Sequence, residues 1–110
     1  MPRIPNWKIN EQVQDLNEFS NYNNSIVAVR SGSEYIIVHW NTTVLRFDIE
    51  TKEVKFLYEK YFSQTTSTLL GRIVRSLPRE SVIRYIQEIT DSADRQRFRR
   101  MLGRIDPEIW

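Results

Sequence analysis

The sequence contains no cysteine, a single histidine and three glycines in 110 residues. Without cysteine the chain can form neither a disulfide nor a thiolate metal site, and one histidine cannot build a histidine metal cluster. Gly32, Gly71 and Gly103 stand far apart, so there is no glycine-rich loop of the kind that cradles phosphates. These absences exclude the common thiol, zinc and P-loop chemistries.

The one histidine, His39, does not suggest catalysis. As a general base it would need an orienting acid, but it lies within a strand-like segment beside Trp40. A histidine in that position is typical of a packed or surface strand residue. We therefore expect a non-enzymatic protein with no cofactor and no metal.

Long apolar runs are also missing. No segment approaches the about 20 apolar residues that cross a membrane, and the start of the chain has no signal-peptide core. We expect a cytoplasmic protein with no membrane partner, and the length predicts one domain over residues 1–110.

Basic residues are unevenly placed. Residues 1–62 hold seven Lys or Arg and eight Asp or Glu, whereas residues 63–110 hold nine Arg, no Lys and six Asp or Glu. Arginine grips carboxylates and phosphates with two parallel hydrogen bonds and stacks on rings. The second half is therefore the candidate for contact with an anionic partner, unless its arginines only form a solvated helical surface.

The first half reads as a helix followed by strands. Residues 1–9 look like an arm docked by Trp7, residues 10–19 like a short helix capped by Asn10, and residues 20–25 like a loop. Four segments rich in β-branched and aromatic residues then follow with short connections, which favours an antiparallel meander. These segments are residues 26–29, 34–40, 43–49 and 54–58. Alternation along residues 43–49 predicts one face with Leu45, Phe47 and Ile49 and the opposite face with Val44, Arg46 and Asp48, and along residues 54–58 it predicts Val54, Phe56 and Tyr58 facing inward.

The second half reads as three helices. Hydroxyl side chains crowd residues 63–68, where Thr65 or Thr66 would cap a first helix with its apolar face on Leu69, Leu70, Ile73, Val74 and Leu77. Pro78 marks a break before a second helix over residues 79–89. Residues 90–92 would cap a third helix, which Gly103 and Pro107 end.

The predicted fold class is therefore α+β. It consists of a short N-terminal helix, a four-stranded antiparallel meander and three C-terminal helices packed on one face of the sheet. Within the single domain, the predicted parts are an N-terminal arm over 1–9, helix plus sheet over 10–62, and a helical half over 63–110.

Residues 24–30, the hairpin after them, and the segment Tyr61-Phe62-Ser63-Gln64-Thr65-Thr66-Ser67 resemble a group of short phage-encoded proteins that carry Thr-Thr-Ser just before a basic helix. The resemblance spans residues 19–77 and leaves out the last 33 residues. It implies a small accessory viral protein in the host cytoplasm, in a group with no assigned enzymatic activity. Thr68 and Leu69 stand where the group commonly has a basic residue and a histidine, so no charged contact is carried over there.

Nucleic-acid binding, to DNA or RNA, is the first functional expectation. A hydroxyl-rich helix start can hold a phosphate through backbone N–H groups, and arginines further along can extend the contact. The alternative is that the hydroxyls only cap the helix and that the arginines pair with acids such as Glu80, Glu88, Asp91 and Asp94. The candidate residues are Thr65, Thr66, Ser67, Arg72, Arg75, Arg95, Arg97, Arg99 and Arg100.

Binding to a host protein, such as a defence or transcription component, is the alternative function. The aromatic residues Trp7, Tyr22, Trp40 and Trp110 are suited to anchoring an interface, although each could equally serve in the core or in docking. A homodimer is a further possibility if residues 26–29 form an exposed edge strand. The sequence does not identify the partner or the oligomeric state.

Overall fold

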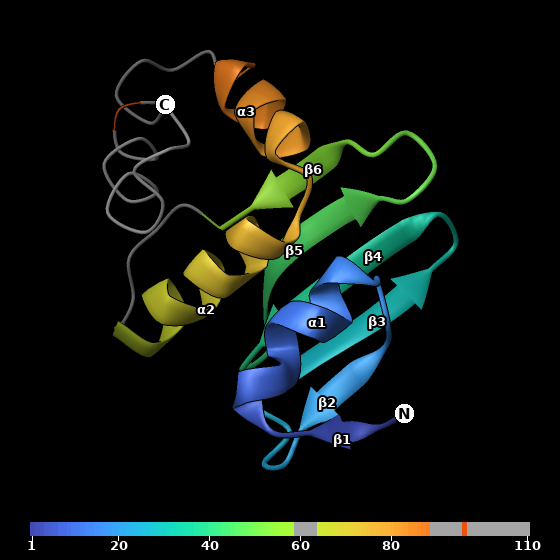
Figure 1. Ribbon diagram of the computed structural model, residues 1–110, viewed down its shortest axis with the longest axis vertical. Helices are drawn as coiled ribbons and strands as arrows, with labels where there is room; N and C mark the ends of the chain where they lie inside the picture. The colour runs from blue at the N-terminus through green and yellow to red at the C-terminus, as the bar shows by residue number, and fades with distance from the viewer. Residues whose placement is uncertain (59–63, 89–95, 97–110) are drawn as a thin grey trace.

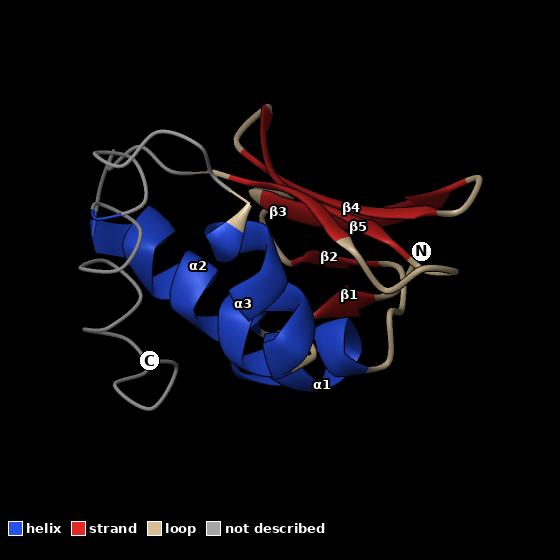
Figure 2. Ribbon diagram, turned by 90° about the horizontal axis from the view of Figure 1, so that it is seen from above, coloured by secondary structure: helices blue, strands red, loops and turns tan. Residues whose placement is uncertain are grey.

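The structure is a computed structural model and describes residues 1–58, 64–88 and 96 (Figure 1). Its strands are β1 (Arg3–Ile4), β2 (Phe19–Asn21), β3 (Ile26–Ser31), β4 (Glu34–His39), β5 (Thr42–Asp48) and β6 (Val54–Leu57). Its helices are the 3-10 turn η1 (Asn6–Lys8), α1 (Ile9–Gln14), α2 (Gln64–Ser76) and α3 (Arg79–Gln87). The α+β character is as predicted, and the three α-helices lie on one face of the sheet (Figure 2).

The sheet differs from the prediction. It has six strands in the order β1-β2-β3-β4-β5-β6, and it is mixed, because β1 pairs parallel with β2 while the other pairs are antiparallel. The predicted four-stranded meander corresponds to β3–β6 and is therefore only part of the sheet. The prediction that residues 26–29 form an edge strand is also wrong, since β3 pairs with β2 on one side and β4 on the other.

The two additional strands come from segments predicted as arm and loop. Ile4 and Phe19 are 7% and 0% exposed, so each buries one apolar side chain under α1, and the Ser20 N–H donates to the Pro2 carbonyl at 2.9 Å. Composition did not predict these strands, because their other residues are polar and prolines lie on both sides of β1. Trp7, expected to dock the arm, is 71% exposed, and Ile4 and Ile9 hold the segment to the core instead.

Helix α1 is shorter than predicted because it ends in a Schellman motif. The N–H groups of Leu16 and Asn17 donate to the carbonyls of Val13 and Gln12 at 3.0 and 2.9 Å, and Leu16 has a φ of 55°. Glycine usually occupies this left-handed position. Because leucine occupies this position, the sequence does not mark the end of the helix, and the helix predicted over residues 10–19 is too long.

The helical layer forms the core as the sequence predicts. Leu69, Leu70, Ile73 and Val74 of α2, and Leu77 just after it, are all at most 5% exposed and belong to the hydrophobic core. Pro78 is the N-cap of α3, which agrees with the predicted break. The third predicted helix lies outside the described residues.

Two β-bulges explain why the predicted faces of β5 and β6 are partly wrong. Register shifts fall between Ile37 and Val38 on β4 and between Arg46 and Phe47 on β5. As a result Val44, predicted to face away from the core, is 0% exposed. On β6, Leu57 is buried and Phe56 is only half-buried on the opposite face, which reverses the predicted alternation.

Candidate binding surface

The structure places the predicted anion site on the first two turns of α2. The helix begins at Gln64, so Thr65, Thr66 and Ser67 lie within its first turn and are not its cap. Further along, Arg72 is half-buried and Arg75 is exposed. Four of the predicted contacts, Arg95, Arg97, Arg99 and Arg100, lie outside the described residues.

Arg72 joins α2 to the N-terminal segment. Its Nη1 donates to the backbone carbonyl of Asn6, which precedes Trp7 and Lys8 in η1. The arginine therefore brings the cationic side of α2 next to η1. This contact could not be predicted from residue types or spacing, because the partner of Arg72 is a main-chain carbonyl 66 residues away.

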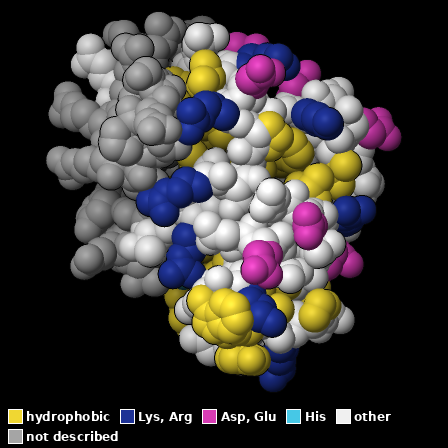
Figure 3. Space-filling model, viewed as in Figure 1, with side chains coloured by type: hydrophobic (Ala, Val, Ile, Leu, Met, Phe, Trp, Pro, Cys, Tyr) yellow, Lys and Arg dark blue, Asp and Glu magenta, His cyan; other side chains and the backbone are white. Residues whose placement is uncertain are grey.

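Three large aromatic side chains project into solvent at one end of the sheet. Trp7, Tyr22 and Trp40 are 71%, 66% and 64% exposed. They lie in η1, in the β2–β3 turn and in the β4–β5 turn, three connections that meet at the same end. We call this surface the aromatic end; in Figure 3 hydrophobic side chains gather there, at the lower edge of the molecule, with Lys and Arg side chains among them.

The buried side chain of Asn21 holds these connections together. Its Nδ2 donates to Asn6 Oδ1 at 3.3 Å and to Ser25 Oγ at 2.7 Å, and its Oδ1 accepts the N–H of Ile26 at 3.0 Å. The Trp40 N–H in turn donates to the Ser25 carbonyl at 2.9 Å. The Asn21 amide thus joins η1 to the β2–β3 turn, and Ser25 links that turn to Trp40.

Trp40 occupies a position that the fold itself does not favour for tryptophan. It and Asn41 form the two-residue turn between His39 and Thr42, with φ values of 48° and 65°. Positive φ at both central residues defines a type I′ turn, where Asn and Gly are preferred and a bulky residue is unfavourable. Because Trp40 is exposed and its backbone is left-handed, its side chain contributes little to the stability of the fold.

The connections that carry these rings contain cations, and the first acid after them is Glu11 in α1, four residues beyond Trp7. The segments that meet here, residues 1–10, 20–26 and 39–43, contain Arg3 and Lys8 and no Asp or Glu. Lys8 Nζ lies 5.1 Å from the centroid of the Trp7 ring, a cation–π distance. With Arg72 bound to Asn6, the aromatic end is bordered by three cationic side chains.

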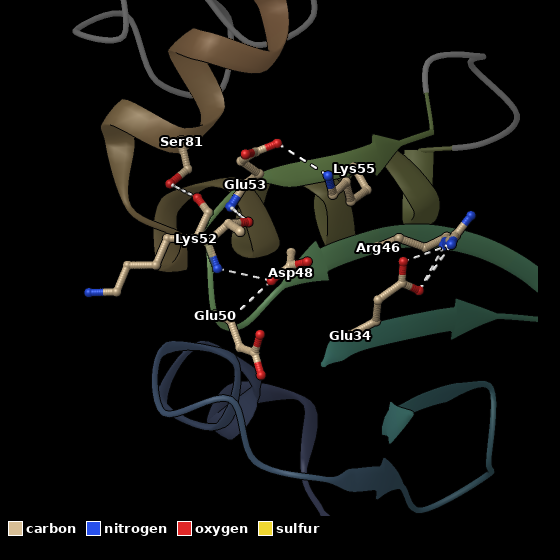
Figure 4. Close-up of polar contacts among 9 residues, drawn as sticks. Glu34, Arg46, Asp48, Glu50, Lys52, Glu53, Lys55 and Ser81 are labelled. Carbon is tan, nitrogen blue, oxygen red and sulfur yellow. Dashed lines mark hydrogen bonds and ion pairs between the residues drawn. The ribbon is translucent and has the colours of Figure 1, made fainter. Parts of the chain in front are cut away.

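Acidic residues gather instead at the opposite end of the sheet. Six of the seven Asp and Glu in residues 1–58 lie in or beside the connections there, at positions 15, 18, 34, 48, 50 and 53. Several of them stabilise that end: Glu34 pairs with Arg46 at 2.7 Å, and Asp48 Oδ1 accepts the N–H groups of Glu50 and Thr51 at 2.9 Å each (Figure 4). The hydrogen bond from the Thr51 N–H is the main cause that holds the pKa of Asp48 below its usual value.

His39 borders the aromatic end from within the core. It is 5% exposed, its ring centroid lies 6.2 Å from that of Trp40, and burial lowers its pKa below the ordinary value. Among the described residues, no group of three or more His, Cys, Asp or Glu is placed to hold a metal ion. No helix of the described part of the chain has the length and apolar character needed to cross a membrane.

Comparison with known proteins returns no relative. No protein-family model matches the chain, and neither a curated protein nor a solved structure matches it. The resemblance to short phage-encoded proteins therefore stays a prediction.

Proposed function

We propose that this chain is a non-enzymatic protein that binds nucleic acid, using the aromatic end and the neighbouring cationic side of α2. The observation that carries the proposal is the composition of one continuous surface. Trp7, Tyr22 and Trp40 are exposed there, the cations Arg3, Lys8 and Arg72 border them, and the connecting segments hold no acid. Rings that stack on bases and cations that neutralise phosphates are the two elements such a surface needs.

The structure changes which residues of α2 can test this proposal. Arg72 holds Asn6, so its replacement would disturb the fold as well as any ligand contact. Arg75 is exposed on the same helix, and α2 contains no acidic residue from Gln64 to Ser76. Arg75→Glu tests the exposed cationic side of this helix, with Arg84→Glu on the exposed side of α3 as its matched control.

The experiment is a titration of labelled DNA and RNA with the full chain at low and at moderate salt. We expect binding that weakens as salt rises, because phosphate contacts release counterions. Arg75→Glu should weaken binding several-fold more than Arg84→Glu, with unchanged circular dichroism for both. Absence of binding at low salt would refute the proposal.

A second candidate is binding to a protein of the host. It is favoured by the same exposed aromatic residues, since Trp and Tyr are enriched among residues that dominate interface energies. A pull-down from nuclease-treated host lysate tests it. One stoichiometric protein that is retained by the parent chain and lost with Trp40→Asn would support this candidate.

A further inference from the structure

We infer that the aromatic end recognises single-stranded nucleic acid, with unpaired bases stacked on Trp7, Tyr22 and Trp40. This inference rests on the proposed function and specifies its ligand. The rings belong to three different connections and are each about two-thirds exposed. The bonds from Asn21 to Asn6 and Ser25, and from the Trp40 N–H to the Ser25 carbonyl, hold the three connections together, so the positions from which the rings project are preorganised.

The placement of the rings distinguishes a single strand from a duplex. Bases in a duplex already stack on one another, so rings projecting from turns cannot reach their faces. Unpaired bases present both faces and can each lie on an aromatic ring, a contact that tolerates any sequence. None of the described α-helices presents these three rings, which lie in the 3-10 turn η1 and in two hairpin connections.

The charges of this surface agree with the same ligand. Arg3, Lys8 and Arg72 can neutralise about three phosphates, which predicts a slope near −2 for log K against log salt on a single strand. The described residues as a whole hold ten Lys or Arg and nine Asp or Glu, so they offer no broad basic surface for a duplex. Stacking must then supply much of the affinity.

Trp40 provides an independent observation. Asn or Gly at this type I′ position would favour the fold more than tryptophan does. The ring nevertheless stands exposed at the tip of the turn, beside His39. The turn disfavours tryptophan at this position, and the ring is not part of the core. A contact between the ring and a ligand would explain why a tryptophan stands there.

The test compares a labelled single strand of about 12 nucleotides with the duplex of the same sequence, using anisotropy at low salt. The variants are Trp7→Ala, Tyr22→Ala and Trp40→Asn, with Trp40→Phe to restore a stacking ring. Lys8→Gln is matched by Lys55→Gln, since Lys55 lies on β6 beside Glu53 and away from the rings. Thermal unfolding checks each variant, and Trp40→Asn should be at least as stable as the parent.

The expected result is that the single strand binds at least about tenfold more tightly than the duplex, and that Trp7→Ala and Trp40→Asn each lose about tenfold. Trp40→Phe should recover most of that loss, and Lys8→Gln should weaken binding more than Lys55→Gln. In a Trp110→Phe background, the fluorescence of the two remaining tryptophans should be quenched on saturation with the single strand.

Three different results would overturn the inference. If the duplex binds as well as the single strand and the aromatic variants bind normally, the inference fails while the proposed function stands. If neither nucleic acid binds at low salt, the proposed function fails as well. A protein partner that survives nuclease treatment and is lost with Trp40→Asn would assign the aromatic end to protein recognition and also overturn it.

Discussion

The guanidinium of Arg72 donates a hydrogen bond to the backbone carbonyl of Asn6, across 66 residues of sequence. The side chain of the same asparagine accepts from Asn21. Asn6 is therefore held from two sides, by α2 through its main chain and by β2 through its side chain. Asn6 therefore adds two polar attachments to the segment that carries Trp7, which the buried side chains of Ile4 and Ile9 hold to the core.

Arg72→Ala should lower the free energy of unfolding by about 1 kcal/mol, because a hydrogen bond from a charged donor to the Asn6 carbonyl is lost on a partly exposed surface. Arg84→Ala, at an exposed position of α3, should change it by less than about 0.5 kcal/mol. Urea denaturation of both variants measures the difference. Equal stability of the two would show that the Arg72–Asn6 contact contributes nothing.

Asn21→Ala should destabilise the fold by about 2 kcal/mol. The substitution removes the acceptor of the Ile26 N–H and the donor to Ser25 Oγ, both inside the protein, and a buried group left without its partner is costly. Asn17→Ala is the control, since that amide makes one exposed contact of 3.3 Å to Gln12. Chemical denaturation would contradict the role of Asn21 if both variants lost the same amount.

The left-handed leucine at the end of α1 predicts an unusual order of substitutions. Leu16→Gly should stay within about 1 kcal/mol of the parent, because relief of the positive φ offsets lost packing. Leu16→Val should cost about 2 kcal/mol, since a β-branched residue resists that conformation. Thermal unfolding of the two variants decides. A valine variant more stable than the glycine variant would be evidence against the Schellman geometry.

His39 should make stability depend on pH in mildly acidic solution. Burial lowers its pKa in the folded chain below the ordinary 6.5, so the unfolded chain takes up a proton that the folded chain does not. As pH falls below about 6.5, the free energy of unfolding should drop by up to about 1.4 kcal/mol per pH unit, until the folded pKa is reached. Above that range this group contributes no pH dependence. His39→Gln should remove this slope in unfolding measured between neutral and mildly acidic pH.

Regular elements with strong apolar patterns could be predicted from the sequence. The segments that became β3–β6 were recognised from β-branched and aromatic residues, and the buried face of α2 from its spacing. The predictions that were wrong concern the end of α1 and the faces of β5 and β6, where single residues have uncommon roles. Leu16 ends a helix without glycine, and the extra residues at the bulges reverse the faces of Val44 and Phe56.

The aromatic end could be predicted only in part. Trp7, Tyr22 and Trp40 were candidates for an interface, but a sequence does not say whether such a ring packs inward or faces solvent. Asn21 joins two of their connections from one buried position, η1 through Asn6 and the β2–β3 turn through Ser25, and the Ser25 carbonyl accepts the N–H of Trp40. Asparagine in a polar segment is typical of a loop, so its role in tertiary structure left no local signal.

The strict agreement between strand order and chain order has a consequence for how the protein folds. Each strand pairs only with neighbours in the sequence, and β2 to β6 are joined by antiparallel hairpins, so this part of the sheet can grow by successive hairpins with little loop-closure entropy to overcome. The long-range step is the docking of α2 onto the finished sheet and η1. We therefore expect a transition state in which the central hairpins are formed and the Arg72 contact is not, and substitutions at Arg72 should speed unfolding and leave the folding rate nearly unchanged.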